Sequence, residues 1–450
     1  MSSPFFVVSC LNSKKRCTFE KTYYTSYTMK HNIKFLLFAT LLWSTSLYSA
    51  SKAFIHTSDG IEEIRTEEID SIKTVNNELQ FMHTGDPFKQ IDISQIDSIT
   101  FFTYEDEQPV GKIVGGDISM LPRYEAKGNP YYDINGNRVK PLEFFKELGW
   151  NSMRVRLFVE PNKASREDIG SGVVQDLPYV IQLGKKIKAA GFKFMLDFHY
   201  SDSWADPAKQ TIPDSWKWAN ASALNDTLYH YTKRCLSALK AAGAEPDYIQ
   251  IGNEISYGML WNIGKCYPSG DQNWNTFAGF LNSASKACRE ICPKAKIIIH
   301  IERSGQPDVC YNFYKRIQDH HVDYDIIGLS YYPFWHNDLN VLGNTLNKLE
   351  NGFPDKPVQI VETAYYYQWY PNDGIDHDFR NKWPDTPEGQ RKYTEDLINE
   401  LKKHNNVNAL YWWFPEENGN GVIDNWINRG LFDDNNGKAL PAIYELGKFK

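Results

Sequence analysis

The sequence predicts an α/β protein: a (β/α)8 TIM barrel with a small N-terminal β-rich appendage. Eight short β-prone segments lie between residues 112 and 414, amphipathic helical stretches separate them, and polar residues gather where the segments end. Eight strand–helix units over about 250 or more residues are typical of a closed parallel barrel. A doubly wound open sheet would give the same alternation, but no glycine-rich phosphate-binding motif follows the first strand, which disfavours it.

Each predicted strand is a short run of apolar and β-branched residues. In chain order the strands are expected at 112–119, 152–159, 192–199, 247–253, 296–301, 325–332, 358–363 and 408–414. Helical periodicity is clearest at 177–191, 226–243 and 389–404. The barrel is therefore expected over residues 113–450.

The chain before the barrel changes character several times. From Met29, two lysines, a short apolar run and several small residues form the pattern of a secretory signal peptide over residues 29–50. The apolar run is short for a membrane span, and an uncleaved anchor is the alternative. Residues 1–28 would then be a leader that is either not translated or disordered. We expect an exported protein, in the periplasm, on the cell surface or in the medium.

Residues 51–104 form the predicted appendage. The stretch "EEIDSIKT" at 67–74 recurs as "SQIDSITF" at 94–101, with alternating apolar residues that indicate short strands. The segment is too small to hold a strong core by itself. Residues 105–112 are polar and contain proline and glycine, which indicates a linker.

Composition limits the kind of partner. The formal net charge of −7 argues against nucleic acid, which requires a basic surface. Aromatic residues make up 14% of the chain, which suits a core and also suits the apolar faces of sugar rings. Five cysteines lie beyond the leader, and we expect buried thiols with at most two disulfides. Nothing in the sequence implies a stable protein partner.

Charged residues mark the ends of the second and third strands. In such a barrel the active site lies at the C-terminal ends of the strands. The second strand carries Arg154 and Arg156 on one face, and buried arginines need acidic partners. The third strand ends in Asp197 and His199. The residues at this end of the barrel are therefore candidates for a site.

Two glutamates, Glu254 and Glu362, end the fourth and seventh strands, whose tips face each other across a closed barrel. A retaining glycosidase needs such a pair, because one carboxyl group protonates the leaving oxygen while the other attacks the anomeric carbon. Arg154 or Arg156 would keep the attacking carboxylate ionised. Asn253 would bind the sugar 2-hydroxyl. Each residue alone is commonly structural or solvated, but together they predict a glycosidase.

With these residues in place, the chain resembles glycoside hydrolase family 53, the arabinogalactan endo-β-1,4-galactanases, from about Val114 to Phe449. The matching stretches are "GGDISMLPRYEAKG", "NSMRVRLFVEP", "LDFHYSDSWADPAKQTIPDSW", "IQIGNEISYGMLW", "IIIHIE", "SYYPFW" and "IVETAY". The stretch "DFHYSDSWADP" is far more specific than the Asn–Glu pair, which marks only a larger clan. The resemblance implies retaining cleavage of internal bonds in β-1,4-galactan, a polysaccharide substrate, with no cofactor required for catalysis.

Carried over position by position, Glu254 resembles the acid/base of this family and Glu362 its nucleophile. The residues that resemble those around the reacting sugar are Asn253, Arg154, His199, Tyr332 and Trp413. Further cleft positions are Trp204, Asp206, Trp261 and His300. Trp412 and Trp413 alternate along the last strand, so one should face the core and the other the site.

Two departures concern the loops. Phe414 stands where other members often have an acid. Some members hold calcium in loops after the seventh and eighth strands, and the residues here that could serve as ligands are Asp373, Asp376, His377 and Asp378. A structural calcium ion is therefore an expectation from the resemblance.

Two alternatives stay open at this point. One is another retaining endo-β-1,4-glycanase of the same clan, such as a mannanase or a cellulase. The other is a glycan-binding barrel without activity. The presence of both carboxylates argues against the second, because a degenerate site commonly loses one.

Overall fold

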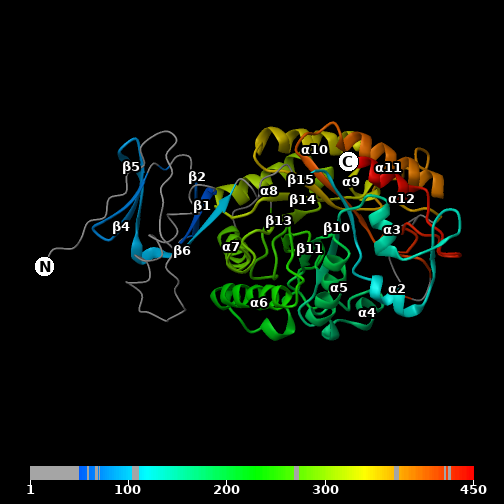
Figure 1. Ribbon diagram of the computed structural model, residues 1–450, viewed down its shortest axis with the longest axis horizontal. Coiled ribbons are helices and arrows are strands. Elements are labelled where there is room, and N and C mark those ends of the chain that lie inside the picture. Colours follow the sequence, from blue (N-terminus) through cyan, green and yellow to red (C-terminus); the bar gives the residue numbers. More distant parts are fainter. Residues whose placement is uncertain are drawn as a thin grey trace, which may run out of the picture. The chain divides into compact units, whose positions relative to one another are not determined.

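The computed structural model describes residues 50–57, 60–65, 69, 71–103, 111–267, 273–368, 374–419, 422–423 and 427–450. The chain forms two compact units, residues 1–109 and residues 110–450 (Figure 1). No helix in the described ranges is long and apolar enough to cross a membrane. Residues 1–28, residues 29–49 of the predicted signal peptide and residues 105–110 of the predicted linker lie outside the described residues.

The first unit holds two three-stranded antiparallel sheets. One has the order β2-β1-β6 and the other the order β3-β4-β5. The strands are β1 (Ala50–Thr57), β2 (Gly60–Arg65), β3 (Ser71–Val75), β4 (Glu78–His83), β5 (Asp86–Asp92) and β6 (Ile96–Thr103), with a short 3-10 helix at Ile93–Gln95. A small buried cluster of Ile55, Ile64, Leu79, Phe81, Ile91 and Ile96 forms its core. The β-rich appendage is confirmed.

The second unit is a closed eight-stranded parallel barrel with the order β10-β11-β12-β13-β14-β15-β16-β7. Its strands are β7 (Ile113–Asp117), β10 (Ser152–Leu157), β11 (Lys193–Phe198), β12 (Tyr248–Ile251), β13 (Lys296–Ile301), β14 (Ile326–Tyr331), β15 (Val358–Thr363) and β16 (Val407–Trp413). Each observed strand lies inside a predicted strand or extends at most one residue beyond it. The predicted TIM barrel is therefore confirmed.

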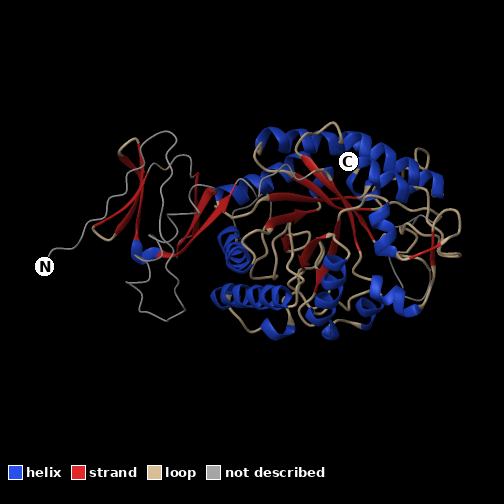
Figure 2. Cartoon of the chain, viewed as in Figure 1, coloured by secondary structure: helices blue, strands red, loops and turns tan. Residues whose placement is uncertain are grey.

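Helices surround the barrel strands (Figure 2). They are α2 (Leu121–Lys127), α3 (Pro141–Glu147), α4 (Arg166–Gly170), α5 (Leu177–Ala189), α6 (Ala221–Ala241), α7 (Trp274–Ile291), α8 (Pro307–Asp319), α9 (Pro333–His336), α10 (Leu339–Gly352), α11 (Pro387–Leu401) and α12 (Ala442–Leu446). A small hairpin joins β8 (Tyr131–Tyr132) to β9 (Arg138–Val139), and 3-10 helices lie at Pro161–Lys163, Asp214–Trp216, Arg303–Gly305 and Gly447–Phe449. Asp176, Asn220, Asp338 and Thr386 cap α5, α6, α10 and α11 by accepting from backbone N–H groups of the first turn.

The barrel interior is layered by polarity. An apolar cluster of Ile113, Met195, Tyr248, Ile298, Ile326, Val361, Ala409 and Tyr411 fills one layer. Gly115 makes room for it, because a Cβ there would lie 2.2 Å from the Ser152 carbonyl oxygen and 2.9 Å from the Tyr411 ring. Further along the same strands, towards their C-terminal ends, the interior side chains become polar. That change of polarity places the candidate site at the mouth.

Candidate active site

Arg154, on β10, is the hub of the polar cluster and is almost fully buried. Its Nη1 donates to Oδ2 of Asp117 at 2.7 Å, and its Nη2 donates to Oδ2 of Asp197 at 2.8 Å. Nη2 also lies 2.8 Å from Oε1 of Glu362 and 3.0 Å from Oδ1 of Asn253. The guanidinium thus has the acidic partners that a buried cation needs.

Arg156 has a different place from Arg154. Its Nη1 lies 3.2 Å from Oδ1 of Asp117, and its guanidinium lies 4.6 Å from the Trp204 ring and 4.9 Å from the Phe414 ring. Burial lowers the pKa of Arg156, and Asp117 opposes that change. Of the two arginines, the structure pairs Arg154 with Glu362, and Arg156 supports the wall behind the pair.

Glu362 enters the barrel through a β-bulge in β15. Ile360 packs in the outer core and Val361 in the inner layer, so strict alternation would turn Glu362 outward. The pairing register shifts at this point, with Leu329 opposite Ile360 and Ser330 opposite Glu362. A bulge inserts one residue and re-aims the side chains after it. The Glu362 carboxylate therefore faces the interior, where it meets Arg154.

The Glu362 carboxyl group is held at both oxygens. Oε1 lies 2.8 Å from Nη2 of Arg154, and Oε2 accepts from the Tyr332 hydroxyl at 2.9 Å. Burial raises the pKa of Glu362, and the cation of Arg154 and the hydrogen bond from Tyr332 oppose that rise. These two partners favour the ionised form, which a nucleophile requires.

Glu254 lies in a turn directly after β12, and the backbone of this turn is strained. Its backbone has φ +50°, in the left-handed region, and Gly252, two residues earlier, has φ +100°. The side chain is half-buried, and its Oε1 accepts from Oγ of Ser330 at 2.7 Å. Because Ser330 is the strand partner of Glu362, this hydrogen bond brings Glu254 beside the tip of β15.

The two glutamates have unequal surroundings. Burial raises the pKa of Glu254 well above its usual value, and the nearby Glu362 and Glu302 carboxylates raise it further. The Ser330 hydroxyl opposes that rise. Among the residues that the structure describes, no cation pairs with Glu254 as Arg154 pairs with Glu362. The arrangement therefore favours a protonated Glu254 beside an ionised Glu362, the protonation states that an acid and a nucleophile would need.

Amides and imidazoles fix the orientation of these groups. Asn253 donates from Nδ2 to the Ala205 carbonyl at 2.9 Å, so its Oδ1 faces Arg154. His199 accepts from the Ala205 N–H at Nδ1, 3.0 Å away, and its Nε2 lies 3.1 Å from Oδ2 of Asp197. His199 therefore carries its proton on Nε2 when neutral.

Aromatic rings form the rest of the wall. The Trp413 ring lies 6.4 Å from the Tyr332 ring and 6.2 Å from the Trp204 ring, in edge-on contacts. Trp412 points the other way, packs against Tyr393 and donates to the Arg429 carbonyl at 2.8 Å. One tryptophan thus faces the cluster and the other the core, as alternation requires. Such rings suit the C–H faces of a sugar.

Two predicted cleft residues lie in neighbouring loops. Asp206 accepts from the N–H groups of Ala208 and Lys209 at 2.8 and 3.0 Å, which closes a turn. Trp261 bridges to Thr211, and the Lys265 ammonium lies 3.8 Å from its ring. The bridge between Thr211 and Trp261 joins the loops after β11 and β12, and neither Asp206 nor Trp261 is hydrogen-bonded to the two glutamates.

The calcium prediction stays a prediction. Asp373 lies outside the described residues, and Asp378 is paired with Arg380 at 2.6 Å. Asp376 and His377 donate backbone N–H groups to the Phe334 carbonyl. Among the residues that the structure describes, no group of three or more His, Cys, Asp or Glu side chains is arranged to hold a metal ion.

Sequence reasoning missed four polar residues of the cluster: Asp117, Gln250, Ser330 and Glu302. Asp117 ends β7 and lies opposite both Arg154 and Trp413 in the strand pairing. Ser330 stands two residues before Tyr332, and period-two alternation could have placed both on one face. Gln250 is buried three residues before Asn253, and Glu302 is buried two residues after His300. Short polar residues within apolar strands are the signal that was available.

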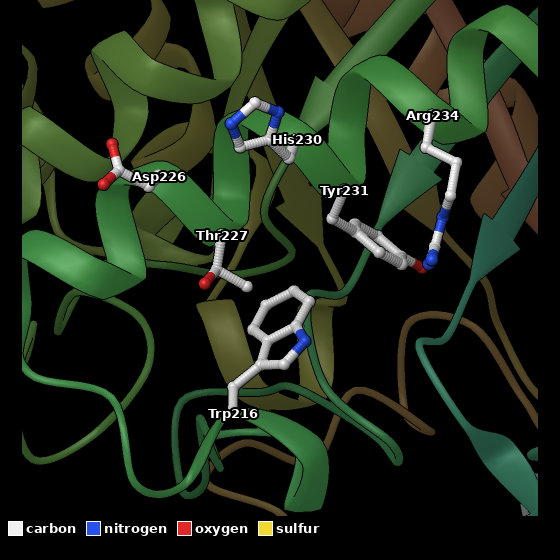
Figure 3. A pocket seen from close by; sticks show the side chains of 6 residues that line it. All are labelled: Trp216, Asp226, Thr227, His230, Tyr231 and Arg234. Atoms are coloured by element: carbon white, nitrogen blue, oxygen red, sulfur yellow. The ribbon is translucent and has the colours of Figure 1, made fainter.

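A separate groove of about 360 Å³ lies outside this cluster (Figure 3). It is lined by Trp216, Asp226, Thr227, His230, Tyr231 and Arg234, which belong to α6 and the short helix before it. None of these residues takes part in the cluster around Arg154.

Comparisons with known proteins agree with this geometry. Residues 113–446 match the family model described as glycosyl hydrolase family 53. The chain is 33% identical over 348 residues to the arabinogalactan endo-beta-1,4-galactanase of Cellvibrio japonicus, covering 73% of this chain and 89% of that protein. It is 27% identical over 403 residues to the endo-beta-1,4-galactanase of Bacillus subtilis, covering 86% and 83%. The GH53 catalytic domain of Ignisphaera aggregans superposes with a TM-score of 0.68 at 32% identity, covering 75% of this chain and 96% of that structure.

Proposed function

The chain belongs to glycosyl hydrolase family 53, and from that premise we propose that it is a secreted endo-β-1,4-galactanase that acts with retention of configuration. The observation that carries the proposal is the unequal pair at the barrel mouth. Glu362 is held by Arg154 and Tyr332, while Glu254 receives one neutral hydroxyl donor and lies near other carboxylates. Two carboxyl groups with opposed environments are what an acid and a nucleophile require.

In the first step, Glu362 attacks the anomeric carbon and the bond to the glycosidic oxygen breaks. Glu254 gives its proton to that oxygen, so the leaving chain departs as an alcohol. The Glu362 carboxylate becomes a covalent ester of the sugar. Arg154 and Tyr332 orient the attacking group, since each binds one of its oxygens.

In the second step, Glu254 is ionised and takes a proton from water, which attacks the same carbon and releases Glu362. The two inversions give net retention. Asn253 uses one amide hydrogen on the Ala205 carbonyl and has a second for the sugar 2-hydroxyl. The walls of Trp413 and Trp204 would receive the apolar faces of the sugars.

The substrate part of the proposal is supported by relatives that are named as galactanases. Reducing ends released from β-1,4-galactan, mannan and carboxymethylcellulose measure it directly. We expect galactan to be cleaved to short oligosaccharides, with the β-anomer formed first in proton NMR spectra. Faster release from mannan or carboxymethylcellulose would refute the substrate, and a first-formed α-anomer would refute retention.

The export part of the proposal is supported by the signal pattern over residues 29–50. Expression of the full chain in a bacterial host, followed by mass spectrometry of the N-terminus, tests it. We expect a mature chain that begins near residue 50. A protein that keeps residues 29–50 and stays in the membrane fraction would instead be anchored.

A further inference from the structure

We infer that His300 and Ser330 form a positioning pair that directs the acid proton of Glu254 to Oε2, the carboxyl oxygen that Ser330 does not bind. The inference rests on the proposed glycosidase function and concerns a step within it. Ser330 Oγ lies 2.7 Å from Oε1 of Glu254, and Nε2 of His300 lies 2.8 Å from the same Oγ. Both His300 and Ser330 are fully buried.

The direction of these hydrogen bonds is set from Arg154, which can only donate. Its Nε lies 3.4 Å from Oε1 of Gln250, so the Gln250 oxygen faces the arginine. The Gln250 amide nitrogen then donates to Oδ1 of Asp197 at 2.5 Å. Its second hydrogen faces Nδ1 of His300 at 3.0 Å, Oδ1 of Asn253 at 3.2 Å and the Gly252 carbonyl at 3.3 Å. The nearest of these is Nδ1 of His300, which favours an unprotonated Nδ1.

A second donor supports this tautomer. The backbone N–H of Glu254 points to Nδ1 of His300 at 3.4 Å. Oδ1 of Asn253 also lies 3.0 Å from Nδ1 and accepts from Arg154 at 3.0 Å with one of its two lone pairs. The backbone N–H of Glu254 can only donate, however, and it fixes Nδ1 as an acceptor. Burial lowers the pKa of His300 well below its usual value, and Arg154 lowers it further, so the ring is neutral. Its single N–H is then on Nε2, aimed at Ser330.

The consequence for Glu254 follows from counting hydrogens. A serine hydroxyl has one hydrogen, and the His300 Nε2–H occupies its acceptor side. The Ser330 hydrogen must therefore point to Oε1 of Glu254. Oε1 cannot face a donor and carry a proton in the same direction, so the transferable proton resides on Oε2. The same hydroxyl stabilises the ionised form of Glu254 in the second step, and no rotation of the carboxyl group is needed between steps.

The test compares Ser330→Ala with Ser304→Ala. Ser304 is a matched control, because its buried hydroxyl donates to the Ser330 carbonyl at 2.5 Å and does not reach Glu254. The readout is the alkaline limb of the pH profile of kcat/KM for galactan, which reports the pKa of the acid/base residue in the free enzyme. A purely structural serine would lower activity without moving this limb.

We expect Ser330→Ala to move the alkaline limb up by about one pH unit, because the ionised carboxyl loses a donor. Turnover of galactan should fall about 10-fold or more, since general acid catalysis is worth about 10²–10⁴. With an aryl galactobioside that has a 2,4-dinitrophenolate leaving group, the rate of the first step should fall less, because that group departs without protonation. Ser304→Ala should leave the limb in place.

Two further variants keep the inference testable if Ser330→Ala is unstable. Ser330→Thr retains the hydroxyl and should restore the wild-type limb. His300→Leu should move the limb in the same direction as Ser330→Ala. The two changes should not add in the double variant, because His300 acts through Ser330.

An unmoved limb in Ser330→Ala, or an equal shift in Ser304→Ala, would overturn the inference while wild-type galactan cleavage still supported the proposed function. Additive shifts in the double variant would overturn it as well. A wild-type protein that cleaves no β-1,4-galactan would instead refute the proposed function.

Discussion

Replacing Tyr332 by phenylalanine removes a single hydrogen bond to the proposed nucleophile. The Tyr332 hydroxyl donates to Oε2 of Glu362 at 2.9 Å, and both side chains are buried. The phenyl ring would keep its contacts with the Trp413 ring, 6.4 Å away. The substitution therefore isolates the effect of one donor on one carboxylate.

The size of the effect follows from the charge of the acceptor. A hydrogen bond to an ionised group is worth about 1.5–3 kcal/mol. One pKa unit corresponds to about 1.4 kcal/mol, so the pKa of Glu362 should rise by about one to two units. Burial already raises this pKa, and loss of the donor acts in the same direction. Because Glu362 must be ionised to attack, the acid limb of kcat/KM should move to higher pH by that amount.

Tyr331→Phe is the matched control. The Tyr331 hydroxyl is also buried and also donates at 2.9 Å, but its acceptor is the Asn337 carbonyl, away from the glutamates. The pH dependence of galactan hydrolysis should therefore separate the two variants. A Tyr332→Phe enzyme whose acid limb coincides with that of the wild type, or a control that shifts equally, would show that this hydroxyl does not set the ionisation of Glu362.

Other expectations concern the same pair, the barrel wall and the loops. Glu362→Gln should lower galactan hydrolysis at least about 10⁴-fold, measured as reducing ends, with binding retained, and undiminished hydrolysis would refute the nucleophile. Glu254→Ala should spare an activated aryl galactoside far more than galactan, and azide should give a β-galactosyl azide. Arg289 binds Asp323 and Asp325 at 2.8 Å in a buried cluster, so Arg289→Met should lower the free energy of unfolding by about 3–5 kcal/mol in urea titrations. If the predicted calcium ion is bound, EDTA should lower Tm and added calcium should restore it, whereas an unchanged Tm would argue against it.

The barrel was predictable because its signals are local. Apolar runs such as 296–301 and 358–363 cannot remain exposed, and amphipathic stretches such as 177–191 must bury one face. Asn253 and Glu254 could be placed at a strand end from adjacent residues alone. Helices such as α7 and α8 did not emerge as clearly. Asn273 before α7 and Gln306 before α8 make no side-chain capping hydrogen bond, although α8 begins with a proline and has an acid in its first turn.

The facing of Glu362 required the tertiary structure. Alternation along β15 predicts an outward side chain, and only the shifted pairing with β14 turns it towards Arg154. Strand register depends on hydrogen bonds to a neighbour far away in sequence, so no local pattern contains it.

The sequence by itself determined the barrel, the pair of glutamates and the presence of two arginines on one strand face. The tertiary structure decided that Arg154 rather than Arg156 binds Glu362, and that Ser330 and Asp117 belong to the cluster. The physical reason is distance: periodicity predicts the face of a side chain only along a regular strand. A bulge such as the one at Glu362, and pairing across 2.7 to 2.8 Å, depend on how neighbouring strands are staggered.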